Sequence, residues 1–175
     1  MLAAYLARTS ADSITGAEIF FNSQGHTAGG ISLSTVIEGI TSALRRRTDI
    51  GISTGLILCF LRHLPEYDAF ETLDQALPYK DKIIGVGLNS SEMGYPPSKF
   101  KRVFDCARDK GFHFMALAGE EGPPEYVWQA LYDLTRHLLK RMLDAGLKAP
   151  SIPTIRPISA SIWVTISTGS PPRWI

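Results

Sequence analysis

Two adjacent carboxylates, Glu120 and Glu121, directly follow an apolar run that ends at Gly119 in the stretch HFMALAGEEGPPEY (113–126). An acid at the end of a buried strand is partly removed from water, which suits it to proton transfer. Gly119 has no side chain, so a ligand could approach the backbone there. Alternatively, both acids belong to a solvated turn before a helix, where the helix dipole favours negative charge. Spacing alone leaves both interpretations open.

Other polar groups also follow apolar runs. They are Asn22-Ser23, Arg62-His63 and the segment NSSE at 89–92. In α/β sheets and barrels, ligands bind at the carboxyl ends of the strands. We therefore expect these polar groups to converge on one face of the fold, together with Glu120.

The four histidines are candidates for metal binding, but none is paired as His-x-His. His113 alternates with phenylalanines in an apolar run, so we expect it to be packed rather than to bind a metal. His63 ends an apolar run and could face the pocket, and His26 lies in a glycine-rich loop, where we expect it to be exposed.

Four short apolar runs predict the strands that position these groups: 17–21, 55–61, 83–88 and 112–117. All are apolar on both faces, as in parallel strands covered by helices. Apolar residues at three-four spacing predict helices at 33–47 and 67–77. Pro at the start and Gly at the end predict helices at 96–111 and 123–146. This alternation of strands and helices predicts an α/β fold with a parallel sheet.

The composition is that of one globular domain: 175 residues, 45% hydrophobic, 20% charged and a net charge of +1. The near-neutral charge predicts neither nucleic acid nor an anionic membrane as a partner. No apolar run approaches the roughly 20 residues that span a bilayer, and the N-terminus does not resemble a signal peptide. Cys59 and Cys106 lack a CxxC spacing, so we expect no disulfide framework, a core position for Cys59 and a cytoplasmic location.

The stretch AGEEGPPEYVWQAL (118–131) resembles the adenosine and adenine deaminase family of zinc amidohydrolases, whose members carry His-Ala-Gly-Glu before a similar Glu-Gly-Pro-Pro segment. Blocks at 17–40, 55–100 and 137–148 agree, and the segments CFLRHL and GLNSSE are most similar to the bacterial and fungal adenine deaminase branch. The resemblance covers residues 2–148. It implies a TIM-type (β/α)8 barrel, a zinc cofactor and hydrolytic deamination of a 6-aminopurine in purine salvage. It also implies Glu120 as proton donor and Gly119 as a substrate contact.

The sequence departs from the family pattern at the metal. Leu117 occupies the position of the zinc-binding His, and leucine has no lone pair to offer a metal. The His-x-His, Asp-His-Gly and Ser-Asp-Asp-Pro motifs of the family are also missing. We therefore expect no metal site in this chain. A complete barrel typically needs about 250 residues, so the resemblance implies a partial barrel of strands two to five.

We divide the chain into a partial barrel domain (1–148) and an irregular, divergent tail (149–175). The tail has no acidic residue and is rich in proline, so the possible strand at 160–167 should not continue the βα alternation. Codons exist for PSIPTIRPISA (150–160) that, read two bases later, encode Ile-Asn-Ser-Asp-Asp-Pro-Ala-Tyr-Phe-Gly. We hypothesise that the tail is a shifted reading frame, which the coding DNA would test.

Three functions stay open at this point. The chain is a deaminase by descent, a non-catalytic relative that binds purines, or an interaction module that pairs with a full-length barrel. The open sheet edges of a partial barrel predict self-association.

Overall fold

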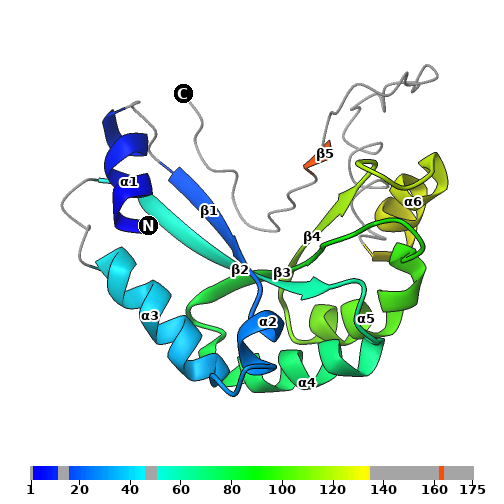
Figure 1. Cartoon of the computed structure of the whole chain (residues 1–175), viewed down its shortest axis with the longest axis horizontal. Coiled ribbons are helices and arrows are strands. Elements are labelled where there is room, and N and C mark those ends of the chain that lie inside the picture. Colours follow the sequence, from blue (N-terminus) through cyan, green and yellow to red (C-terminus); the bar gives the residue numbers. More distant parts are fainter. Residues whose placement is uncertain (1, 12–15, 46–50, 135–161, 164–175) are drawn as a thin grey trace.

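The structure is a computed structural model that describes residues 2–11, 16–45, 51–134 and 162–163. Strands and helices alternate along the chain (Figure 1). The strands are β1 (Gly16–Phe21), β2 (Ser53–Leu61), β3 (Ile83–Asn89), β4 (His113–Ala118) and β5 (Ile162–Trp163). The helices are α1 (Leu2–Ala11), α2 (Gln24–Thr27), α3 (Leu33–Arg45), α4 (Glu66–Ala76), α5 (Lys101–Asp109) and α6 (Pro124–Gln129), with shorter helical turns η2 (Leu77–Tyr79), η3 (Pro97–Phe100) and η4 (Ala130–Leu134).

The strands β1 to β4 are parallel, neighbour one another in sequence order and curl into a half-barrel (Figure 1). Each strand lies within two residues of its predicted bounds, which confirms the α/β class with a parallel sheet. Parallel neighbours need a crossover connection, and α3, α4 and α5 lie in these connections. Among the described strands, β1 pairs only with β2, so its outer edge has no strand beside it.

The short strand β5 pairs antiparallel with the end of β4, through Leu117 with Trp163 and Ala118 with Ile162. This two-residue strand therefore does not extend the parallel alternation. The remainder of the tail, and the end of the predicted helix 123–146, lie outside the described residues.

The helices follow the predicted pattern with two differences. The predicted helices 67–77 and 96–111 each combine an α-helix with a shorter turn, and Pro78 and Pro97 lie at the first or second position of these turns, η2 and η3. The helices α1 and α2 were not predicted. The four residues of α2 are too few to show three-four periodicity, and α1 lacks the Pro and Gly boundaries that marked other helices.

The main core lies between the sheet and its helices. Leu58 and Phe60 of β2 and Leu88 of β3 are buried in it, and Phe60 meets Phe104 of α5 edge to face at 6.0 Å. The inner face of the sheet holds a smaller cluster of Ile57, Cys59 and Met115, with Phe20 against it. Cys59 is 2% exposed, which confirms its predicted core position.

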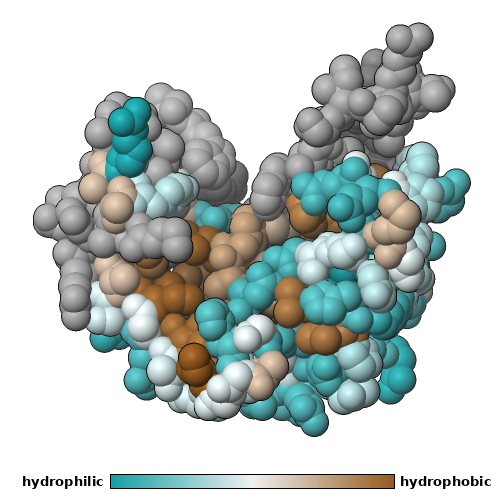
Figure 2. All heavy atoms as spheres, viewed as in Figure 1, coloured by the Kyte–Doolittle hydropathy of each residue, from teal (hydrophilic) through white to brown (hydrophobic). Residues whose placement is uncertain are grey.

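Apolar residues gather in the hollow between the two ends of the curled sheet, on the face shown in Figure 2, and hydrophilic residues dominate the lower right of that view. In the described part of the chain, no helix is both long and apolar enough to cross a membrane.

Candidate functional site

The carboxyl ends of the four parallel strands bring the predicted polar groups to one edge of the sheet. Asn22 follows β1 and Asn89 ends β3, and their side-chain amides bond to each other across β2. Asn22 Nδ2 donates to Asn89 Oδ1 at 2.7 Å, and Asn89 Nδ2 donates to Asn22 Oδ1 at 3.1 Å. Asn22 Nδ2 also donates to the carbonyl of Cys59 at 3.3 Å. This pair links β1, β2 and β3 at the edge where α/β proteins bind ligands.

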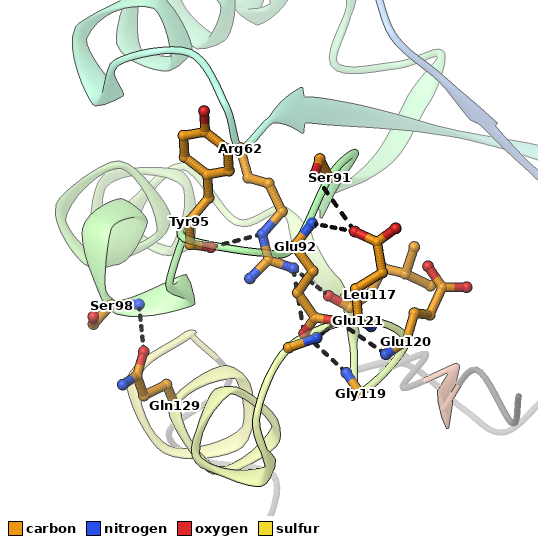
Figure 3. Close-up of polar contacts among 11 residues, drawn as sticks. Arg62, Ser91, Glu92, Tyr95, Ser98, Leu117, Gly119, Glu120, Glu121 and Gln129 are labelled. Carbon is orange, nitrogen blue, oxygen red and sulfur yellow. Dashed lines mark hydrogen bonds and ion pairs between the residues drawn. The ribbon is translucent and has the colours of Figure 1, made fainter. Parts of the chain in front are cut away.

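The turn after β4 is organised by a single buried carboxylate, Glu92, which is 3% exposed (Figure 3). Its Oε1 accepts the backbone N–H of Gly119 at 2.9 Å. Its Oε2 accepts the N–H groups of Glu120 and Glu121 at 2.9 Å and of Gly122 at 3.0 Å. Four consecutive amides that precede α6 therefore find their hydrogen-bond acceptor on another loop. This satisfies four backbone donors of the turn that would otherwise be left without a partner.

Both glycines of this turn are required by its geometry. Gly119 has φ +88°, in the left-handed region that favours glycine, and a Cβ there would lie 3.0 Å from Val127 Cγ2. A Cβ on Gly122 would lie 2.8 Å from Glu92 Cδ and 2.5 Å from Tyr126 Cδ2. The sequence AGEEGPP thus permits a backbone that closes tightly around the Glu92 carboxylate.

Arg62 lies behind this carboxylate and is fully buried. Its Nε donates to the carbonyl of Tyr95 and its Nη1 to the carbonyl of Leu117, both at 2.9 Å. The same Nη1 lies 3.7 Å from Glu92 Oε1, and the guanidinium lies over the Tyr126 ring at 5.8 Å. One side chain therefore ties the end of β2 to the end of β4 and to the loop after β3.

Burial and neighbouring charge shift the pKa values of Glu92 and Arg62 in opposite directions. Burial favours the neutral form of Glu92, but the N–H groups of Glu121, Gly119 and Gly122, with the charge of Arg62, hold its pKa below the usual value. Burial lowers the pKa of Arg62, and the charge of Glu92 partly offsets this. The pair is thus a carboxylate with backbone donors and a guanidinium whose Nε and Nη1 are bonded to carbonyls, while Arg62 Nη2 is buried without a hydrogen-bond partner in the described part of the chain.

The two adjacent acids that follow Gly119 differ in position. Glu121 turns back, and its Oε2 accepts the backbone N–H of Glu92 at 3.2 Å and lies 3.4 Å from Ser91 Oγ. Glu120 is exposed, and its side chain points away from the Glu92 carboxylate (Figure 3). The predicted desolvation of Glu120 is therefore wrong, because this residue lies in the turn after β4, where its side chain is exposed to solvent. Glu121 belongs to the turn itself, as the alternative interpretation held.

Arg62 and Glu92 were expected among the polar groups that converge at the strand ends, but their burial and their pairing were not predicted from the sequence. The signal available was a pair of oppositely charged residues, each next to an apolar run that predicts a buried strand. Long-range pairing of this kind has no fixed spacing, so periodicity does not reveal it.

Leu117 continues the inner face of β4, two residues after Met115, and its side chain is partly exposed. His63 is exposed, with its Nδ1 2.9 Å from Ser90 Oγ, and His26 is exposed as predicted. In the ranges that the structure describes, no three His, Cys, Asp or Glu side chains form a group that could hold a metal ion. The donor set of the described residues therefore does not fit a zinc ion.

A second polar group lies at the start of α2, after β1. Gln24 Oε1 accepts the N–H of Leu61 at 2.8 Å, which ties this segment to the end of β2. Ser23 and Gln24 are both buried, and Ser23 Oγ and Gln24 Nε2 have no hydrogen-bond partner within the described part of the protein.

Comparison with known proteins identifies relatives over most of the chain. The family model for adenosine deaminase matches residues 2–148. The chain is 56% identical over 147 residues to the adenine deaminase of Pseudomonas putida, covering 83% of this chain and 45% of that protein. It is 52% identical over 157 residues to the adenine deaminase of Albidiferax ferrireducens, covering 89% of this chain and 44% of that protein.

Two solved structures share the fold. The crystal structure of adenine deaminase from Arthrobacter aurescens superposes with a TM-score of 0.73 at 44% identity, covering 77% of this chain and 41% of that one. An amidohydrolase from Burkholderia ambifaria, solved with bound Zn, gives a TM-score of 0.73 at 28% identity, covering 77% and 38%.

The half-barrel of β1 to β4 matches part of the barrel of these relatives, which confirms the predicted partial TIM-type barrel. The chain spans less than half the length of the relatives described above. On the match of residues 2–148, this chain belongs to the adenosine deaminase family.

Proposed function

We propose that this chain is the part of an adenine deaminase-type barrel that binds a 6-aminopurine, and that it binds the purine without deaminating it. The observation that carries the proposal is the turn after β4, which holds Gly119 and Glu120 in a fixed backbone at the edge where the strand ends meet. In this proposal Glu120 bonds a ring nitrogen of the purine, and Gly119 lets the ring approach the backbone. The identity with adenine deaminases supports adenine as the base.

The metal is the reason for proposing binding without turnover. Hydrolytic removal of the amino group in this family uses zinc to generate hydroxide at neutral pH. Leu117 occupies the position of a zinc-binding His, and the described residues bring no three metal-binding side chains together. A purine held beside Glu120 would therefore lack an activated water to attack it.

Calorimetry with adenine, combined with an ammonia assay in the presence of added zinc, tests the proposal. We expect adenine to bind the unmodified chain, Glu120→Gln to weaken binding, and no ammonia to form. Absence of adenine binding would refute the purine site. Stoichiometric zinc with ammonia release would refute the lack of turnover.

The variant Leu117→His separates two explanations for the missing activity. Because the other ligand motifs of the family are also absent, we expect this single change to restore neither zinc binding nor ammonia release. Recovery of activity in Leu117→His would mean that one ligand alone was limiting.

Self-association, or pairing with a full-length barrel, stays a prediction that the open edge of β1 supports. Light scattering of the purified chain and co-purification with a full-length deaminase would test it.

A further inference from the structure

We propose that Glu92 is a positioning residue: its carboxylate is a built-in anion that organises the turn from Gly119 to Gly122 and so fixes the backbone of Glu120. This inference rests on the proposed contact between Glu120 and the purine. It gives the buried pair of Arg62 and Glu92 a structural role in the site.

The first argument is the convergence of donors. Four consecutive backbone N–H groups, from Gly119 to Gly122, point at one carboxylate within 3.0 Å. Parallel N–H dipoles repel one another unless an anion lies between them, and concave turns of this kind commonly bind phosphate or carboxylate ligands. Here the anion comes from the chain itself, from the loop after β3. The conformation of the turn therefore depends on the negative charge of Glu92.

The second argument is the way the carboxylate is held. Arg62 is anchored through Nε and Nη1 by the carbonyls of Tyr95 and Leu117, so it presents a fixed positive charge behind Glu92. Glu121 returns a bond to the backbone N–H of Glu92. The loop of Glu92 and the turn of Glu120 thus hold each other through bonds in both directions. Neither segment can shift without breaking charge-assisted hydrogen bonds.

The third argument is the place of Glu120 within this arrangement. Its backbone N–H is one of the four that bond Glu92, while its side chain points away from the cluster (Figure 3). The main chain of Glu120 is therefore fixed by Glu92, while its exposed side chain lies outside the cluster. A purine contact needs this precision because misplacement by about 1 Å weakens oriented interactions severely.

Hydrogen–deuterium exchange of the full chain tests the proposal. In Glu92→Gln, which keeps the shape but removes the charge, we expect the amides of 119–122 to exchange about tenfold faster or more, because hydrogen bonds to charged acceptors are the strong ones. Amides of β2 and β3 should change little. In Glu92→Ala, sodium formate should restore protection of the four amides, and sodium chloride at equal ionic strength should not. Glu125→Ala, an exposed acid next to the turn, is the matched control and should leave their exchange unchanged.

Adenine affinity links the turn to Glu120. We expect Glu92→Ala to bind adenine about tenfold more weakly and formate to recover the loss, a rescue that a general stability role would not give. Unchanged protection of 119–122 in Glu92→Gln would overturn the proposal, as would failure of formate in a folded Glu92→Ala. If Glu92→Ala does not fold, the exchange rates of the 119–122 amides in Glu92→Gln test the proposal by themselves. If the unmodified chain binds no adenine, the proposed function fails, yet the exchange data still test whether Glu92 organises the turn.

Discussion

Replacing Arg62 by methionine should destabilise the protein strongly, because Arg62 is fully buried and bonds two carbonyls. Methionine fills similar space but offers no donor. The carbonyls of Tyr95 and Leu117 would each lose their Arg62 donor, at about 1–3 kcal/mol each for a buried unpaired group. Glu92 would lose its cation but keep four backbone donors. The two losses sum to about 2–6 kcal/mol, and the usual cost of removing one partner of a buried pair, about 3–5 kcal/mol, lies within this range.

Urea unfolding followed by circular dichroism would measure this cost. With a slope of about 1–3 kcal/mol per molar urea, the midpoint should fall by at least about 1 M. The matched control is Arg102→Met, because Arg102 lies 3.8 Å from Glu66 but its side chain is 81% exposed. Such a surface pair contributes about 0–1 kcal/mol, so the control should unfold near the unmodified protein.

A double-mutant cycle with Glu92→Gln separates the charge from the carbonyl contacts. The separation of 3.7 Å between Arg62 Nη1 and Glu92 Oε1 exceeds a hydrogen bond, so we expect a coupling of only about 1 kcal/mol. Most of the cost should therefore persist in the Glu92→Gln background. A cost below about 1 kcal/mol for Arg62→Met in the unmodified protein would refute the reasoning, since it would mean that both carbonyls find other partners.

Three further predictions follow from the same structure. The pKa of Glu92 is lowered in the folded state, so the Glu92 carboxylate stabilises the protein above its ordinary pKa of 4.5, and this stabilisation is lost as the pH falls through the lower folded pKa. Between pH 6 and 3, the urea midpoint should therefore fall less steeply in Glu92→Gln than in the unmodified protein. An equally steep fall in both would contradict this. Gly122→Ala should destabilise the protein by about 1–3 kcal/mol, because the added methyl group meets Glu92 and Tyr126. Gly39→Ala, in a helix with open space around it, should instead stabilise the protein by about 0.5–1 kcal/mol. Similar thermal midpoints for the two variants would refute the packing argument. Burial raises the pKa of Cys59 to about 12. A thiol reagent at pH 8 should therefore label Cys59 only on unfolding, whereas the partly exposed Cys106 should react in the native state. Labelling of Cys59 in the native protein, measured by mass spectrometry, would count against its burial.

The positions of β1 to β4 and of the crossover helices could be predicted because each depends on local pattern. A strand buried on both faces has to be apolar throughout, as in the run from Leu56 to Phe60, and its helix has to turn one apolar stripe toward the sheet. The rule that parallel strands end at a common edge then predicted the meeting of Asn22 and Asn89, whose side chains bond to each other. The helix α1 was not predicted because it lacks the Pro and Gly residues that marked the boundaries of other helices.

The sequence by itself determined the parallel sheet, the edge at which polar groups meet, and the absence of a histidine at position 117, since these follow from residue type and period. Only the tertiary structure decided which of two adjacent acids faces solvent and which holds the turn, and that Glu92 with Arg62 organises it. The physical reason is that a buried charge needs several partners at fixed distances, and these come from three strand ends far apart in the chain. No spacing along the chain encodes that convergence.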